Sequence, residues 1–78
     1  MSLVELTEYL VKNIVKNPTS VEVTKKEDGT IEVLVAEEDL GAVIGRAGKI
    51  ANAIRTLVQA AAYTTDQGRV RINIDAKK

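Results

Sequence analysis

The sequence predicts an α+β domain in which helices pack on one face of a three-stranded sheet, with the elements in the order α-β-β-α-α-β. Two observations predict this class. Apolar residues recur every three or four positions in three segments, as in helices, and alternate with polar residues in three others, as in strands. At 78 residues, with 45% hydrophobic and 28% charged side chains, the chain has the size and composition of one small folded domain covering residues 1–78.

The first helix is expected to begin after Ser2 and to end at Asn17-Pro18. Ser2 and Glu5 have the spacing of a capping box, in which each side chain satisfies a backbone N–H group of the first turn. The residue before a proline is disfavoured in a helix, so Asn17 is expected to lie outside it. The apolar stripe of this helix is Leu3, Leu6, Leu10 and Ile14.

Two strands, residues 21–24 and 31–35, are expected to form a hairpin. Each alternates between apolar and polar residues, and the Asp28-Gly29 pair between them is a strong turn signal. Because Leu34 makes the second strand apolar on both faces, we expect that strand to be central.

Two helices are predicted next, and a glycine joint separates them. The first runs from Glu37 to Ile44, and its acidic start complements the helix dipole better than it would hold a metal, since consecutive helical residues point in different directions. Gly45-Arg46-Ala47-Gly48 forms the joint, and the second helix runs from Lys49 to about Tyr63. Its main apolar stripe is expected to be Ile50, Ile54, Leu57 and Ala61, with Ala51, Val58 and Ala62 beside it.

The last strand is predicted over residues 69–75, after a polar loop. Val70, Ile72 and Ile74 are expected to face inward, and the alternate residues to face outward. Arg69 and Arg71 on the outward face are typical of a solvated strand edge, with contact to a nucleic acid as the alternative.

The composition excludes several function classes. Without cysteine or histidine, the chain has no thiolate nucleophile, no zinc–sulfur site and no imidazole base, so we expect no enzyme, no metal site and no cofactor. No signal peptide and no apolar run of about 20 residues is present, so a cytoplasmic protein with no membrane contact is expected.

The glycine joint carries the strongest functional signal. Gly45 and Gly48 let a phosphate approach the backbone, the helix that follows offers unpaired N–H groups, and Arg46 and Lys49 add positive charge. The joint is therefore predicted to be a phosphate clamp. The Walker A loop and the dinucleotide fingerprint are excluded, because both need a glycine where Val43 stands.

The run from Asp39 to Lys49, with Ile44-Gly45-Arg46-Ala47-Gly48 at its centre, resembles the signature of a KH domain. The order of elements resembles the type II, bacterial arrangement, and the continuation from Ile50 to Thr56 is similar to the KhpA family of small single-domain bacterial KH proteins. The sequence departs from many KH domains at Ala47, which leaves Arg46 as the only charge inside the joint. It also departs at Ala51, where a large aliphatic residue is common.

This resemblance implies that the protein holds about four nucleotides of single-stranded RNA. By position, Gly45, Arg46, Ala47 and Gly48 would clamp the backbone, with Lys49 and Asn52 as further contacts. One wall of an apolar groove for the bases would come from Gly41, Val43 and Ile44. The opposite wall would come from the strand 31–35 or the turn before it.

The resemblance also implies a role as an RNA chaperone or post-transcriptional regulator in bacterial cell elongation, cell shape and cell division. The long helix has more apolar surface than three short strands need, which predicts an interface with another chain at Val58, Ala62 and Tyr63. By resemblance, that chain is a second copy or a KhpB-like multidomain KH protein. The alternative function is a dimerisation module on a KH scaffold with little RNA binding.

The charge distribution agrees with a local RNA site. The net charge is zero, but residues 1–39 carry four basic and nine acidic side chains, whereas residues 40–72 carry five basic and one acidic. Neutrality is therefore an average over an acidic first half and a basic segment that contains the joint.

Overall fold

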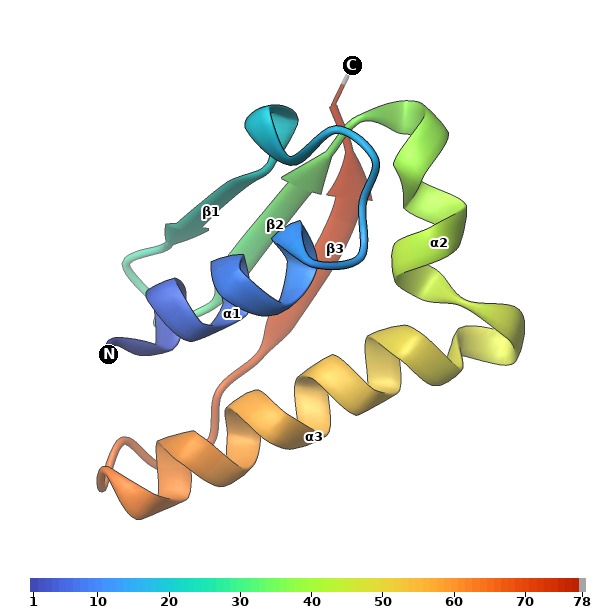
Figure 1. Cartoon of the computed structure of the whole chain (residues 1–78). Coiled ribbons are helices and arrows are strands. Elements are labelled where there is room, and N and C mark those ends of the chain that lie inside the picture. Colours follow the sequence, from blue (N-terminus) through green and yellow to red (C-terminus); the bar gives the residue numbers. More distant parts are fainter. Residues whose placement is uncertain (78) are drawn as a thin grey trace.

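The computed structural model describes residues 1–77 and confirms the predicted α+β class and order of elements (Figure 1). The helices are α1 (Leu3–Lys12), α2 (Leu40–Ile44) and α3 (Lys49–Thr64). The strands are β1 (Glu22–Lys25), β2 (Ile31–Val35) and β3 (Ile72–Ala76). Short 3-10 turns lie at Pro18–Ser20, Glu37–Asp39 and Arg46–Gly48.

The sheet has the order β1-β2-β3, which confirms that β2 is central. β1 pairs with β2 in antiparallel fashion across the Asp28-Gly29 turn, and β3 pairs with β2 in parallel, with Val33 opposite both Val23 and Ile74. A parallel neighbour needs a crossover connection, which α2, the joint and α3 provide.

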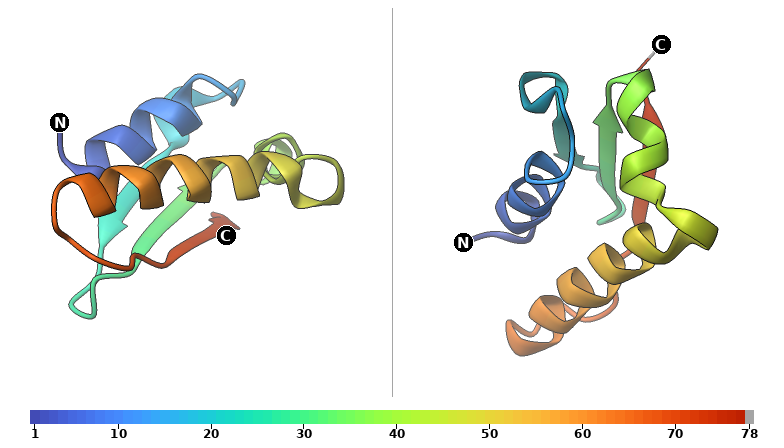
Figure 2. Two further views of the ribbon diagram at one scale, coloured as in Figure 1. Left: turned by 90° about the horizontal axis from the view of Figure 1, so that it is seen from below. Right: turned by 45° about the vertical axis from the view of Figure 1, so that its right-hand side comes forward.

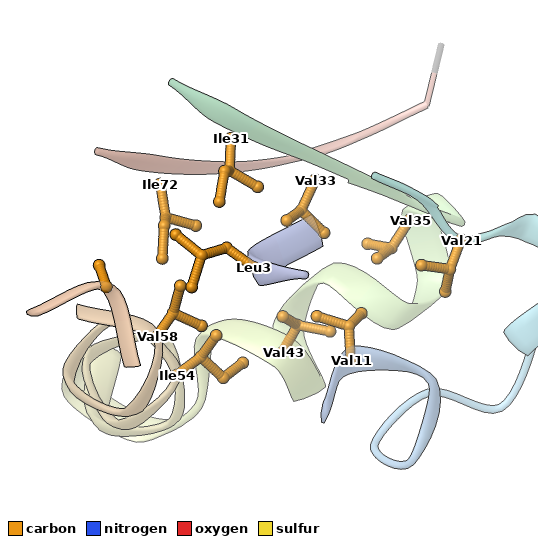
Figure 3. Packing of buried hydrophobic residues seen from close by; sticks show 11 residues of the cluster. Leu3, Val11, Val21, Ile31, Val33, Val35, Val43, Ile54, Val58 and Ile72 are labelled. Carbon is orange, nitrogen blue, oxygen red and sulfur yellow. The ribbon is translucent and has the colours of Figure 1, made fainter. Parts of the chain in front are cut away.

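The core lies between the sheet and the helices. Helices α1 and α3 cover one face of the sheet, and α2 lies beside β3 (Figures 1 and 2). Side chains of β2 and β3 point toward those of the three helices (Figure 3). The largest buried apolar side chains are Leu3, Val11, Val21, Ile31, Val33, Val35, Val43, Ile54, Val58 and Ile72.

Helix α1 ends at Lys12, four residues before the predicted end. Its capping box is present: the Glu5 N–H donates to Ser2 Oγ (3.1 Å), and the Ser2 N–H donates to Glu5 Oε1 (2.8 Å). At the other end, Asn13 Nδ2 donates to the Tyr9 carbonyl (2.7 Å) and caps the last turn. The proline therefore marks the end of the connection rather than the end of the helix.

The core face of α3 is offset from the predicted stripe. Ala51, Ile54, Val58 and Ala62 are buried, whereas Ile50 is 39% and Leu57 is 54% exposed. Through this inner face α3 contacts both α1 and α2.

β3 begins at Ile72, three residues after the predicted start. Residues 69–70 lie beside α3 instead, and the Val70 N–H donates to Gln59 Oε1 (2.9 Å). Within residues 1–77, no helix is both long enough and apolar enough to cross a bilayer.

Candidate nucleic-acid interface

The glycine joint turns the chain sharply between α2 and α3. The Gly45 N–H donates to the Gly41 carbonyl (2.9 Å) and closes α2, and the Gly48 N–H donates to the Gly45 carbonyl (3.2 Å). Gly45, Ala47 and Gly48 have φ angles of 76°, 56° and 76°. Two of these positive angles fall on glycine, where they cost little, and the third on alanine, where the left-handed region is strained.

The two glycines are needed for different reasons. A Cβ at Gly45 would overlap Ile50 Cγ1 and lie 2.9 Å from the Ile50 backbone nitrogen. A Cβ at Gly48 would meet nothing closer than Asn52 Nδ2, at 3.9 Å. Gly45 is therefore required by its close approach to Ile50 as well as by its φ angle, and Gly48 by its φ angle alone. The large aliphatic side chain that packs against the joint is therefore that of Ile50. Ala51, the position at which many KH domains have a large aliphatic residue, is buried.

The cations of the joint are exposed and unpaired. The three ion pairs among residues 1–77 all join a lysine to a glutamate, at Lys12, Lys26 and Lys77, and none involves Arg46 or Lys49. Gly48 occupies the N-cap position of α3 and offers no side-chain cap, so the first N–H groups of α3 have no side-chain partner. The joint thus combines a helix N-terminus, a bare backbone and two free cations, which suits an anion such as a phosphate.

The predicted groove wall on α2 needs one correction. Gly41 is exposed with no atom within 4 Å of where a Cβ would stand, and Ile44 is half-buried, as a wall requires. Val43 is fully buried and points into the core (Figure 3), so it cannot touch a base. Val43 is the one fully buried residue of α2, and Leu40, three positions earlier on the same face, packs against the core as well.

The strand that lies opposite α2 is β3, not β2. β2 is hydrogen-bonded on both edges, whereas β3 is an edge strand that contacts α2. That wall was predicted from residues 31–35 or the turn before them, whereas the parallel crossover places the last strand next to α2.

Asn52 is exposed on α3, and its partner Arg55 was not among the residues predicted from the sequence. Arg55 Nη1 donates to Asn52 Oδ1 (3.3 Å), and Arg55 Nε donates to the Ile72 carbonyl at the start of β3 (3.2 Å). Arg55 therefore links α3 to the start of β3. Its position three residues after Asn52, on the same helical face and within the basic segment, was the available signal.

Asp39 is a buried carboxylate that connects the start of α2 to the segment after α1. Only 2% of it is exposed, and its carboxylate accepts hydrogen bonds from the Lys16 N–H (3.1 Å), the Asn17 N–H (3.0 Å) and Asn17 Nδ2 (2.9 Å). Burial raises the pKa of Asp39, but these hydrogen bonds outweigh it, so that the pKa lies below its ordinary value. Asp39 thus ties the start of α2, which carries the joint, to the connection after α1.

The three predicted interface residues do not lie together. Val58 and Ala62 are fully buried against the sheet and α1, so the folded domain cannot offer them to another chain. Tyr63 is 60% exposed. The apolar side chains that α3 does expose are Ile50, Ala53, Leu57 and Ala60, which share one side of the helix.

A Gly-x-x-Gly joint between two helices, set beside a mixed sheet whose last two strands are parallel, defines a KH domain of type II. The family model described as "KhpA/KhpB, KH domain" matches residues 4–74, and the chain belongs to this family.

Three relatives illustrate the similarity, and each bears the name RNA-binding protein KhpA. The one from Caldanaerobacter subterraneus subsp. tengcongensis is 51% identical over 73 residues, covering 90% of this chain and 96% of the relative. The one from Clostridium acetobutylicum is 46% identical over 73 residues, with the same coverage of both chains. The one from Treponema pallidum is 44% identical over 64 residues, covering 78% of this chain and 80% of the relative.

Proposed function

We propose that this protein binds single-stranded RNA, about four nucleotides at a time, and acts without catalysis as an RNA chaperone or post-transcriptional regulator. The observation that carries the proposal is the uncapped start of α3 with Arg46 and Lys49 exposed beside it and unpaired. The names of the relatives add support. The wider role in cell elongation, cell shape and division rests on the resemblance to the KhpA family.

In this proposal the RNA backbone lies on the joint and the bases lie in the groove. The N–H groups of the first turn of α3, Arg46 and Lys49 bind phosphates. The exposed backbone at Gly41 and the side chain of Ile44 face the bases from one side, and the free edge of β3 faces them from the other. With two cations at the joint, we expect modest affinity and a weak sequence preference.

The test is the double substitution Arg46→Asp and Ala47→Asp. Both side chains are exposed, and aspartate tolerates the left-handed φ at position 47, so the fold is expected to survive. A matched control is Lys25→Asp with Thr19→Asp, which makes the same change in charge at exposed positions away from the joint. Single-stranded RNA binding should be lost in the first variant and kept in the second, with unchanged circular dichroism in both. RNA binding that survives in the joint variant would show that the clamp lies elsewhere.

A second function is favoured by the exposed side of α3. Ile50, Ala53, Leu57 and Ala60 form an apolar stripe, and Leu57 is more than half exposed. We propose that this stripe pairs with the same stripe of a second copy, or with the KH domain of a KhpB-like multidomain protein, whose KH domain shares the family model. These contacts replace the predicted ones at Val58 and Ala62.

Sedimentation of the wild type and of Leu57→Glu tests the pairing. The wild type should form a dimer at micromolar concentration and Leu57→Glu should be monomeric, because a charge would be buried at the centre of the interface. Tyr9→Glu, at an exposed site on α1, is the control and should remain dimeric. A wild type that sediments as a monomer, and that does not bind a KhpB-like protein, would refute this second proposal.

A further inference from the structure

A hollow of about 1060 Å³ opens beyond the joint, between α3 and the segment that leads into β3. Six of its lining residues matter here: Asp28, Arg55, Gln59, Tyr63, Arg69 and Arg71. It begins where Arg55 crosses from α3 to β3 and extends along α3 as far as Tyr63. The four residues of the joint do not line it.

The hollow is electropositive. Three arginines line it and only one carboxylate, Asp28, whose Oδ1 already accepts the Thr30 N–H (2.9 Å). None of these arginines takes part in the ion pairs of residues 1–77. The hydrogen bond to Thr30 chiefly, and the positive charge of Arg71 to a smaller extent, lower the pKa of Asp28. The surplus positive charge is therefore available to an anionic ligand.

The backbone that carries the arginines is held firmly. Gln59 Nε2 donates to the Gly68 carbonyl (2.8 Å), and Gln59 Oε1 accepts the Val70 N–H (2.9 Å), so one side chain fixes both sides of Arg69. The Arg71 carbonyl accepts the Ile31 N–H (2.8 Å), which anchors Arg71 to β2. Arg55 uses two of its five N–H donors within the protein, and the others remain for a ligand. The guanidinium groups are thus presented from an ordered frame.

The hollow also contains an aromatic ring. Tyr63 is 60% exposed and is one of only two aromatic residues in the chain. Free cations beside an exposed aromatic ring are the combination by which proteins bind single-stranded nucleic acids, through phosphates and stacked bases respectively.

The hollow continues the path of the joint. One face of α3 lies between its core face and its apolar stripe. This face carries Asn52, Arg55, Gln59 and Tyr63. At a rise of about 1.5 Å per residue, Arg55 lies roughly 9 Å and Tyr63 roughly 21 Å along the helix from Lys49. A strand that leaves the clamp along this face therefore runs into the hollow.

We propose that the hollow is a second subsite for the same RNA strand, which takes the nucleotides beyond the four held at the joint. Arg69 and Arg71 bind phosphates, Tyr63 stacks on a base, and Arg55 joins the two subsites. This inference rests on the proposed function, since the strand reaches the hollow from the clamp. It changes the interpretation of Arg69 and Arg71 from a solvated strand edge to a ligand surface, and that of Tyr63 from a chain interface to a stacking platform.

The experiment compares two RNA lengths against hollow variants of the full chain. The probes are uridine oligonucleotides of four and of ten nucleotides, and the variants are Arg69→Ser with Arg71→Ser, and Tyr63→Ser. We expect the arginine variant to lose about tenfold in affinity for the ten-nucleotide probe and to lower its salt slope by about 1.4, which corresponds to two phosphate contacts. Tyr63→Ser should lose roughly fivefold or more. Both variants should bind the four-nucleotide probe within about twofold of the wild type, because that probe is held at the joint alone.

The control variant is Lys12→Ser with Lys16→Ser, which removes two exposed charges on and after α1 and should bind both probes as the wild type does. Two further ten-nucleotide probes, one with 4-thiouridine at the 5′ end and one with it at the 3′ end, give a second readout. One of the two should crosslink to Tyr63. Unchanged binding of the long probe by the hollow variants would overturn the second subsite, and so would an equal loss for both probes. The proposed clamp is tested separately by Arg46→Asp with Ala47→Asp, which should lose both probes.

Discussion

At the scale of single residues, Gly45, Gly48 and Gly41 surround the same site but have different structural demands. Gly45 needs both a positive φ and the absence of a Cβ, Gly48 needs only a positive φ, and Gly41 needs neither. The spacing of a Gly-x-x-Gly motif does not reveal this difference, because the contact with Ile50 depends on how α3 leaves the joint.

Alanine substitutions should therefore separate the three glycines in urea unfolding. Gly45→Ala should lower the free energy of unfolding by about 3 kcal/mol, through overpacking against Ile50 and a strained φ together. Gly48→Ala should lower it by about 1 kcal/mol from φ alone. Gly41→Ala should raise it by about 0.5–1 kcal/mol, because it replaces glycine in an exposed helical position. Equal losses at positions 45 and 48 would contradict the role given to Ile50.

Asp39 should make the stability depend on pH in the acid range. Its pKa in the folded chain lies below the ordinary value of 3.8, so the unfolded chain binds a proton more readily. The stabilisation is complete above about pH 5 and is lost as the pH falls through the folded pKa, because protonation breaks the hydrogen bonds from Lys16 and Asn17. Asp39→Asn should flatten the fall in the unfolding free energy between about pH 5 and pH 2.

Part of the fall in the unfolding free energy should remain in Asp39→Asn, because two other carboxyl groups also have a lowered pKa in the folded chain. Hydrogen bonds from the backbone and side chain of Ser2 lower the pKa of Glu5, and hydrogen bonds from the backbone and side chain of Thr30 lower the pKa of Asp28. Glu37→Gln, at an exposed position in the same 3-10 turn, is the control and should keep the wild-type profile. A variant at Asp39 with the full wild-type slope would show that another carboxyl carries the effect.

At the scale of elements, the local signals predicted each helix and strand, whereas their packing faces needed the whole fold. The capping box and the Asp28-Gly29 turn act over a few residues, so the sequence alone was enough for them. Helix α3 has two adjacent apolar sides, one through Ile50 and Leu57 and one through Ala51 and Val58, and periodicity alone does not say which faces the sheet. Packing on α1 and α2 selects the side through Ala51 and Val58.

The loop between α3 and β3 shows the same dependence. Residues 69–70 alternate like strand residues. The side-chain amide of Gln59, however, forms hydrogen bonds with the Gly68 carbonyl and the Val70 N–H, so this segment is held on α3. A contact between a helix and a loop nine to eleven residues away leaves no local pattern. The interpretation of Arg69 as part of a strand edge was wrong for that reason.

Replacing Gln59 should release this loop. Gln59→Ala removes two hydrogen bonds, and we expect a loss of about 1–2 kcal/mol in the free energy of unfolding and faster amide hydrogen exchange at Val70. Gln67→Ala, which removes only an exposed contact with Thr65, is the matched control and should change neither quantity measurably. Unchanged exchange at Val70 in Gln59→Ala would mean that the loop is ordered by its own backbone.

At the scale of the whole molecule, charge is segregated in sequence and, for part of the charged residues, in space. The basic residues of segment 40–72 lie on the joint, on α3 and in the loop before β3, whereas Glu5 and Glu8 lie on α1 and Glu22 lies on β1, at the other edge of the sheet. The sequence predicted the segregation by region. It did not predict that β3 would lie beside α2, or that Arg69 and Arg71 would line one hollow with Arg55, because strand order and loop packing are long-range properties.

This segregation predicts an unusual dependence of RNA affinity on salt. The molecule measures 35 × 24 × 20 Å, so at 0.15 M salt, where the Debye length is about 8 Å, RNA on the joint is screened from the acidic side. At 0.01 M the Debye length is about 30 Å, and the RNA experiences the net charge of zero. The repulsion between one carboxylate and one phosphate roughly 20 Å apart in water is about 0.2 kcal/mol. Two acidic residues that each repel several phosphates therefore weaken RNA binding roughly fivefold, and only at low salt.

Glu8→Gln with Glu22→Gln should therefore raise RNA affinity roughly fivefold at 0.01 M salt and leave it unchanged at 0.15 M. Both residues lie on the acidic side, in surface ion pairs with Lys12 and Lys77 that contribute little to stability, so the fold should be unaffected. Titration of a ten-nucleotide uridine probe by fluorescence anisotropy at the two salt concentrations measures the difference. An equal gain at both concentrations would mean that these glutamates lie close to the bound RNA, and the RNA path would then have to cross α1 or β1 rather than follow α3 from the joint to the hollow.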